Sequence, residues 1–112
     1  MSSAFDLNTL DLAAFEANAM EVADLLRTLG NERRLMMLCK LVEQPEMTVG
    51  SLAEAVALSQ SALSQHLAKM RDENIVTFRR DGQTLWYRIA DPRIAELMAV
   101  LHRLYCRLPA AR

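Results

Sequence analysis

The sequence has few glycines, few cysteines and no long apolar run, and each shortage excludes a class of protein. Three glycines among 112 residues rule out a glycine-rich phosphate-binding loop. Two cysteines are too few for a disulfide scaffold. No apolar run approaches the ~18 residues that a membrane-spanning helix needs, and the acidic first thirty residues are unlike a secretory signal. We expect one cytoplasmic domain over residues 1–112, with flexible ends at 1–8 and 109–112, no membrane association and no cofactor.

Charge is distributed unevenly along the chain, although the formal total is only −1. Residues 1–30 carry a net charge of −4, whereas residues 59–90 and 91–112 carry +2 each. The location of charge matters more than its total when the partner is a polyanion. The basic second half is compatible with a nucleic-acid partner, but an ordinary solvated surface has the same composition.

Capping residues, prolines and a change of hydrophobic period divide the chain into elements. A period of three to four residues predicts helices, and the alternation that begins near residue 75 predicts strands. Asp81-Gly82 predicts a type I′ hairpin turn, in which both residues have positive φ. The predicted elements are helices at 9–30, 32–43, 49–56, 60–74 and 92–108, with Asn8, Asn31, Thr48, Ser59 and Asp91 before them, and strands at 75–80 and 83–89.

Four helices, a hairpin and one further helix are the order of a winged helix-turn-helix, a mainly α fold with a β-hairpin wing. The turn at 57–60 separates two short helices, and Leu63, Leu67 and Met70 of the second should pack inward. Six of the nine residues at 59–67 are Ser, Gln or His, and none is charged. A merely solvated helix face usually carries Glu and Lys. The pattern therefore favours a helix that enters the major groove of DNA.

Candidate DNA contacts lie on this helix and near the tip of the hairpin. Gln can pair with adenine, Ser with a base edge or a phosphate, and arginines at a hairpin tip can reach the DNA backbone or minor groove. Arginines in hairpins also serve solubility alone. We expect His66 to be a half-buried, hydrogen-bonded residue rather than a base reader. The predicted DNA-binding residues are Gln60, Ser61, Ser64, Gln65, Lys69, Arg79, Arg80 and Gln83.

The stretch 31–35 (Asn-Glu-Arg-Arg-Leu), the block 58–67 (Leu-Ser-Gln-Ser-Ala-Leu-Ser-Gln-His-Leu) and the wing resemble the ArsR/SmtB family of repressors. The resemblance runs from about Ala19 to Cys106. It implies a homodimer built on the first and last helices, which binds a palindromic operator in double-stranded DNA and leaves it when an inducer binds. Apolar rows on both helices fit such an interface, and they fit an ordinary core as well. These rows are Leu12, Phe15, Ala19, Val22, Leu26 and Leu29 in the first helix, and Ile94, Leu97, Met98, Leu101, Leu104 and Leu108 in the last.

This sequence lacks the metal ligands of the family at both of the positions where the family's metal sites lie. The cysteine-containing box would fall on residues 47–52, which hold no cysteine. The paired acid and histidine of the last helix would fall on Asp91 and Arg93, and arginine does not bind a cation. His102 and Cys106 share a helix face, but two ligands are a weak signal. We expect no metal site.

The two cysteines are the remaining candidates for a sensor. Cys39 lies in an apolar row, where a small buried side chain is the ordinary interpretation. Cys106 lies beside two arginines, which favour the reactive thiolate. Leu38-Cys39 and residues 102–106 resemble the cysteine segments of the BigR, SqrR and HlyU subgroup, in which the pair reacts with persulfide or polysulfide and DNA affinity falls. The resemblance implies that Cys39 and Cys106 form a disulfide or polysulfide bridge that releases a repressor from its operator.

Other functions remain open from the residues alone. The same thiols could sense an oxidant, arsenite or a metal, although arsenite usually takes three thiolates. The chain could also be an anti-repressor or activator with structural cysteines, or an interaction module that no longer binds DNA. We do not expect an enzyme such as a thiol oxidoreductase, because the sequence has no Cys-x-x-Cys pair, activated nucleophile or cofactor motif. The operator, the target genes, the natural inducer and the distance between the two sulfurs cannot be read from the sequence.

Overall fold

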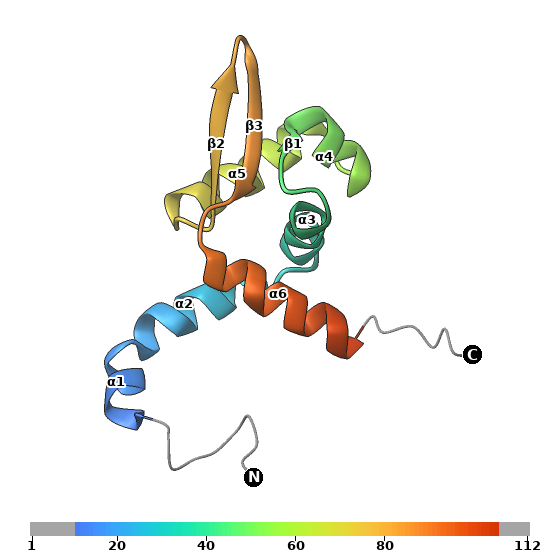
Figure 1. Ribbon diagram of the computed structural model, residues 1–112. Coiled ribbons are helices and arrows are strands. Elements are labelled where there is room, and N and C mark those ends of the chain that lie inside the picture. The colour runs from blue at the N-terminus through green and yellow to red at the C-terminus, as the bar shows by residue number, and fades with distance from the viewer. Residues whose placement is uncertain (1–10, 106–112) are drawn as a thin grey trace, which may run out of the picture.

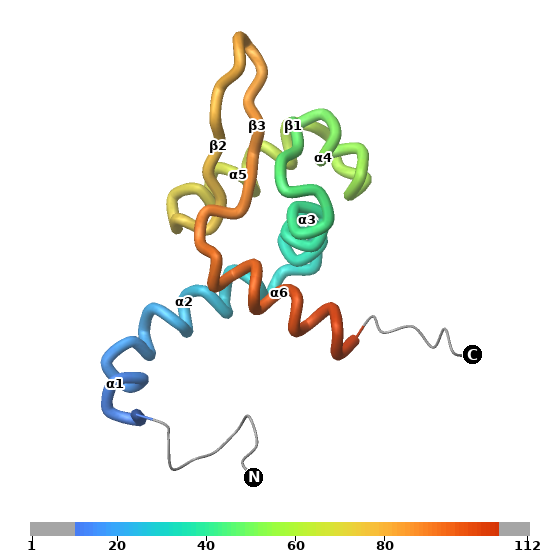
Figure 2. The backbone as a smooth tube through the Cα atoms, viewed as in Figure 1, coloured from blue at the N-terminus to red at the C-terminus, as the bar shows by residue number. Residues whose placement is uncertain are grey.

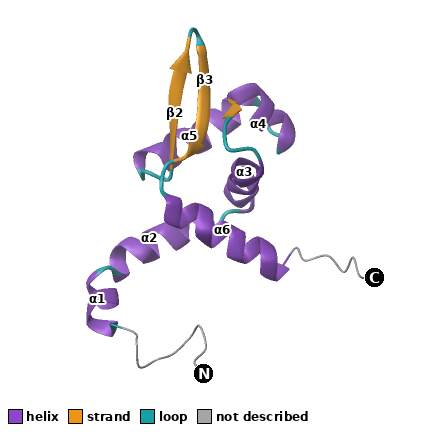
Figure 3. Ribbon diagram, viewed as in Figure 1, coloured by secondary structure: helices purple, strands orange, loops and turns teal. Residues whose placement is uncertain are grey.

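The computed structural model describes residues 11–105, which form six helices and a small antiparallel sheet (Figure 1). The sheet and its long hairpin lie at one end of the molecule, and α1, α2 and α6 lie at the other (Figure 3). The predicted winged helix-turn-helix is confirmed. The elements are α1 Leu12–Ala17, α2 Ala19–Leu29, α3 Glu32–Glu43, β1 Met47–Thr48, α4 Val49–Ala55, α5 Gln60–Asp72, β2 Val76–Asp81, β3 Thr84–Ile89 and α6 Pro92–Tyr105. The predicted cap Asn8, the helix end near Leu108 and the chain ends at 1–8 and 109–112 lie outside the described residues.

The predicted first helix is two helices, which corrects the single helix expected over 9–30. The Asp11 side chain accepts a hydrogen bond from the Ala14 N–H and starts α1. Asn18 ends α1, and its side-chain amide donates to the Ala14 carbonyl oxygen at 3.1 Å. An Asn side chain that bonds back to the backbone competes with helix continuation. The chain consequently changes direction between α1 and α2 (Figure 2).

The core lies beneath the helix-turn-helix, which consists of α4, the turn at 56–59 and α5. Leu63, Leu67 and Met70 of α5 are no more than 1 % exposed, as the sequence predicted. They pack in one cluster with Leu52 of α4 and with Val56, the residue that follows α4. The spacing of four and three residues places all three α5 side chains on one face of the helix. The other face of α5 therefore points to solvent.

The sheet contains a strand that the sequence did not predict. β1 has only two residues, Met47 and Thr48, which pair with Tyr87 and Trp86 of β3. The strand order is β1-β3-β2, so β3 is the central strand. Two residues are too few to show an alternating pattern. Pairing with β3 defines β1, and it joins the middle of the wing to the residue before α4.

The hairpin turn is displaced by one residue from its predicted position. Asp81 pairs with Thr84, which leaves Gly82 and Gln83 as the two-residue loop. Gly82 has φ 67°, and no other described residue of the hairpin has positive φ. Positive φ at the first loop residue alone matches a type II′ turn, so the type I′ prediction was wrong. The predicted faces of the two strands are nevertheless confirmed, with the pairs Val76–Ile89, Phe78–Tyr87 and Arg80–Leu85 on one of them.

The turn between α4 and α5 holds Ala57 in the left-handed region, at φ 57°. The Leu58 N–H donates to the Ala53 carbonyl at 3.0 Å, and the Ala57 N–H donates to the Glu54 carbonyl at 3.3 Å. These two bonds form a Schellman motif, which closes a helix C-terminus. Glycine is the usual residue at this position because the left-handed conformation costs an L-residue about 1–2 kcal/mol.

Replacement of Ala57 by glycine should therefore stabilise the fold. We expect Ala57→Gly to raise the free energy of unfolding by about 0.5–1 kcal/mol, because the relief of strain exceeds the added freedom of the unfolded chain. The measurement is urea unfolding followed by circular dichroism. Ala68→Gly is the matched control: Ala68 is exposed within α5, so the same change should lower stability by about 0.5–1 kcal/mol. A loss of stability in both variants would contradict the assignment of strain to Ala57.

Candidate nucleic-acid interface

The outer face of α5 is polar and exposed. Ser59 caps the helix: its hydroxyl oxygen accepts a hydrogen bond from the Ala62 N–H at 3.1 Å. The first turn that follows contains no acidic residue. Every helix residue predicted to bind DNA is exposed, namely Gln60, Ser61, Ser64, Gln65 and Lys69. The structure thus brings these five side chains together on one accessible surface.

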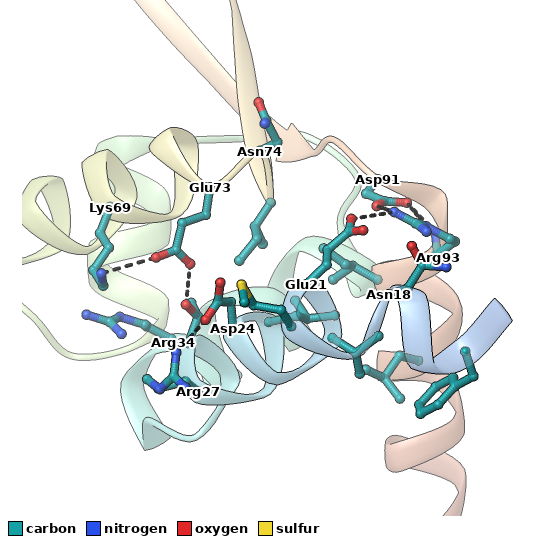
Figure 4. Close-up of a pocket in the computed structure, with 18 of the residues that line it drawn as sticks. Asn18, Glu21, Asp24, Arg27, Arg34, Lys69, Glu73, Asn74, Asp91 and Arg93 are labelled. Atoms are coloured by element: carbon teal, nitrogen blue, oxygen red, sulfur yellow. Dashed lines mark hydrogen bonds and ion pairs between the residues drawn. The ribbon is translucent and has the colours of Figure 1, made fainter. Parts of the chain in front are cut away.

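Lys69 takes part in a network that ties the end of α5 to α2. The Lys69 ammonium lies 3.1 Å from a carboxylate oxygen of Glu73. The same carboxylate accepts a hydrogen bond from the hydroxyl of Thr28, a residue that is only 3 % exposed. The pKa of Glu73 is held below its ordinary value of 4.5, mainly by the hydrogen bond from Thr28 and to a smaller extent by the contact with Lys69. Figure 4 shows Lys69 and Glu73 at the edge of a groove that α2, α5 and α6 line.

His66 lies on the side of α5 that faces α3. Its Nδ1 accepts a hydrogen bond from Nε of Arg34 at 3.3 Å. Burial, and then the charges of Arg34 and Arg33, lower the pKa of His66 below its ordinary value of 6.5. The ring is therefore neutral at pH 7 and accepts at Nδ1. The expectation of a half-buried, hydrogen-bonded histidine is confirmed.

The three wing residues predicted to bind DNA have different surroundings. Arg80 and Gln83 are exposed near the tip, and Arg80 has no ion-pair partner in the part of the chain that the structure describes. Arg79 makes two hydrogen bonds of 2.9 Å to the carboxylate of Glu46, and its guanidinium lies 5.6 Å from the centre of the Trp86 ring. The hydrogen bonds from Arg79 hold the pKa of Glu46 below 4.5. Sequence reasoning missed Glu46, because it lies 33 residues from Arg79 and carries no local signal.

The start of α6 is closed by a cap and an ion pair. The Arg93 N–H donates to a carboxylate oxygen of Asp91 at 2.9 Å, and the Arg93 guanidinium lies 2.7 Å from the other oxygen. These contacts lower the pKa of Asp91. The position that would carry a metal-binding acid in the resembled family is thus occupied by a helix cap. Across residues 11–105, no group of three or more His, Cys, Asp or Glu side chains could hold a metal ion.

The predicted sensor pair is described only in part. Cys39 lies on α3, half-buried and packed against the core. α3 and α6 pack against each other, and α6 is described as far as Tyr105. Cys106 lies outside the described residues, and the pairing of the two cysteines stays a prediction.

An uncovered apolar surface lies at the end of the molecule away from the wing. Within the predicted first-helix row, Leu12, Phe15 and Leu26 are more than half exposed, and only Leu29 is buried. An ordinary core therefore does not account for that row. On α6, Ile94 and Met98 are buried, whereas Leu104 is 64 % exposed. Exposed apolar surface of this extent marks an interaction site.

In residues 11–105, no helix is long and apolar enough to cross a membrane.

The chain is similar in sequence to known bacterial regulators. Residues 31–77 match the model described as bacterial regulatory protein, arsR family. The chain is 41% identical over 98 residues to the transcriptional activator HlyU of Vibrio cholerae, covering 88% of this chain and 90% of that protein. It is 39% identical over 101 residues to the biofilm growth-associated repressor of Agrobacterium fabrum, covering 90% of this chain and 86% of that protein.

Solved structures of such regulators have the same fold. Reduced HlyU from Vibrio cholerae superposes with a TM-score of 0.77 at 41% identity, covering 84% of this chain and 98% of that chain. The transcriptional repressor BigR from Xylella fastidiosa superposes with a TM-score of 0.79 at 36% identity, covering 88% of this chain and all (100%) of that chain. The similarity therefore extends from the helix-turn-helix to the flanking helices.

The lowered pKa of His66 predicts a pH dependence of stability. A histidine with a depressed pKa in the folded state binds fewer protons than it does in the unfolded state. Its contribution to stability is complete above the unfolded pKa of about 6.5 and is lost as the pH falls through the folded pKa. We expect the free energy of unfolding to decrease below pH 6.5 in the wild type, and to decrease less in a His66→Gln variant. Parallel pH profiles of the two proteins in urea unfolding would contradict this account.

Proposed function

Because the chain belongs to the ArsR family of bacterial regulators, in its BigR- and HlyU-like subgroup, we propose that it is a dimeric repressor whose two cysteines sense persulfide and polysulfide. At the level of the family, the chain is a DNA-binding transcriptional regulator and not an enzyme. The observation that carries the proposal is the exposed, uncharged, polar face of α5, which a buried row of apolar side chains holds outward.

We assign base reading to the middle of α5 and backbone contacts to its ends and to the wing. Gln65 has the amide that pairs with adenine, and Ser61 and Ser64 are small enough to let the helix approach base edges. Gln60 at the helix start, Lys69 near its end and Arg80 and Gln83 of the wing are suited to phosphates. Two of the predicted contacts have an acidic partner: Arg79 makes two hydrogen bonds to Glu46, and Lys69 makes a single ion pair with Glu73 at 3.1 Å.

A homodimer accounts for the uncovered apolar surface of α1, α2 and α6. Pairing of these helices between two copies would bury side chains such as Phe15, Met20 and Leu104, which are between 58% and 78% exposed in one chain. A two-fold dimer presents two copies of α5. Two reading helices about one turn of DNA apart match a palindromic operator.

The proposed switch joins Cys39 of α3 to Cys106, which follows α6. One thiolate attacks polysulfide, an S–S bond of the polysulfide breaks, and a shorter polysulfide leaves. The second thiolate attacks the protein persulfide at the carbon-bound sulfur, so that a disulfide forms and hydrosulfide leaves. If both thiols are first persulfidated, attack of one on the other expels hydrosulfide and leaves a trisulfide. The protein thiols are oxidised and the polysulfide is reduced.

A bridge of this kind changes the packing between α3 and α6, and hence the spacing of the two reading helices. A coupling of about 1–3 kcal/mol is common between sites in allosteric proteins and corresponds to a five- to 150-fold change in affinity. Support for a redox-dependent state comes from the similarity to reduced HlyU, and support for repression comes from the similarity to BigR.

The test is DNA affinity measured by fluorescence anisotropy at one salt concentration, on fragments from upstream of the protein's own gene. We expect reduced wild type to bind tightly and polysulfide-treated wild type to bind about tenfold or more weakly. Cys39→Ser and Cys106→Ser should bind like the reduced protein before and after treatment, because neither can form the bridge.

Gln65→Glu is the control for groove binding. It places a carboxylate on the reading face, so it should abolish specific binding whether or not the protein has been treated. Equal binding by treated and reduced wild type would contradict the sulfur switch but not DNA binding. Unchanged binding by Gln65→Glu would contradict the assignment of the reading face.

A further inference from the structure

A pair of charged side chains, Glu46 and Arg79, joins the middle of the wing to the start of the helix-turn-helix. Both hydrogen bonds from the Arg79 guanidinium to the Glu46 carboxylate are 2.9 Å long. Paired, parallel contacts between arginine and a carboxylate fix both distance and orientation. Exposed ion pairs usually contribute little, but this bidentate geometry is the exception.

The strand register explains how Arg79 reaches Glu46 across the sheet. Arg79 is the partner of Trp86, and Trp86 is the partner of Thr48, so the three residues form one row across β2, β3 and β1. Glu46 precedes Thr48 by two residues, which places it on the same side of an extended chain. The Arg79 side chain therefore crosses the central strand, over the Trp86 ring, to meet Glu46. We call this arrangement of Glu46, Arg79 and Trp86 the wing clasp.

The wing clasp fixes the wing directly to the first helix of the helix-turn-helix. Thr48 is both the end of β1 and the N-cap of α4, where its hydroxyl accepts a hydrogen bond from the Ser51 N–H at 3.1 Å. A second contact holds the root of the wing to α5, because the Arg71 guanidinium lies 4.9 Å from the centre of the Phe78 ring. The wing is thus held at its root by α5 and at its middle by β1, and the tip beyond Arg79 extends from these two points.

Arg80 is the natural comparison for Arg79. The two are neighbours in β2, but alternation along the strand places them on opposite faces. Arg80 is exposed and makes no ion pair with any residue of 11–105, so its charge is available to a phosphate. Two of the five N–H donors of the Arg79 guanidinium are used on Glu46, so a phosphate that approached Arg79 would also lie beside the Glu46 carboxylate.

We propose that Arg79 is a positioning residue, which with Glu46 and Trp86 sets the angle of the wing, whereas Arg80 makes the phosphate contact. The proposal rests on the DNA-binding function proposed above. It assigns Glu46, an acidic residue, a favourable role in binding a polyanion. Removal of that negative charge would by itself strengthen DNA binding, so weaker binding by a variant that remains folded indicates lost positioning.

The experiment uses reduced full-length protein with Glu46→Gln, Arg79→Gln or Arg80→Gln. One readout is the slope of log affinity against log salt concentration in DNA anisotropy, which counts phosphate contacts. The other is the fluorescence of the free protein. Trp86 is the single tryptophan of the chain, so its emission reports the wing clasp without DNA. Thermal unfolding by circular dichroism verifies that each variant is folded.

We expect Glu46→Gln and Arg79→Gln to shift the Trp86 emission and to weaken DNA binding about two- to fivefold, the range of one well-formed exposed pair. Their salt slopes should remain close to that of the wild type. Arg80→Gln should leave the emission unchanged and reduce the slope by about one for each wing that contacts DNA.

Two results would overturn the proposal while leaving DNA binding intact. One is a reduction of the salt slope by Arg79→Gln as large as that by Arg80→Gln, which would make Arg79 a phosphate contact. The other is a DNA affinity of the Glu46→Gln variant that equals or exceeds the affinity of the wild type. Failure of the wild type itself to bind operator DNA would refute the proposed function, and the positioning role with it.

Discussion

The burial of Leu63, Leu67 and Met70 is the constraint on which the reading surface depends. These three side chains are no more than 1 % exposed, and their spacing leaves α5 no freedom to rotate about its axis. Both ends of the helix are also fixed. Ser59 caps the start, and at the other end Asn74, with φ 61°, and Ile75 return hydrogen bonds to the last turn. The exposed face is therefore held rigidly, and its side chains are not needed for packing, so they can contact DNA.

The molecule has two ends of opposite character, and α3 lies between them. The end with α5 and the wing is polar and carries exposed arginines, whereas the end with α1, α2 and α6 leaves large apolar side chains uncovered. Three polar links cross from α2 and α3 to the helix-turn-helix: Thr28 to Glu73, Arg34 to His66, and Arg33 to the Val56 carbonyl at 3.3 Å. In the proposed switch, a change in α3 reaches the helix-turn-helix through the two links that start from Arg33 and Arg34.

Local signals in the sequence predicted the helices well. Asn31, Thr48, Ser59 and Asp91 each accept the expected backbone hydrogen bond at a helix start. Such caps depend on residues only two or three positions apart, so the sequence carries them in full. The inward face of α5 was predicted for the same reason, because helical periodicity is local.

The errors concern contacts that the local pattern does not contain. The break at Asn18 is the exception, because it depends on a side chain that competes with the backbone of its own helix, four residues away. β1 exists only through its pairing with β3, and that pairing places Glu46 near Arg79. Arg79 and Arg80 look alike in sequence, yet the structure gives one an acidic partner and leaves the other exposed. The individual DNA contacts and the sensor pair Cys39 and Cys106 stay predictions.

In the proposed function, two copies of this chain bind one operator. The most direct measurement is the mass of the complex between reduced protein and one operator duplex, by light scattering after size exclusion. We expect two chains, each of 12.6 kDa, on each duplex. A complex that contains a single chain, or a dimer that elutes apart from the DNA, would contradict it.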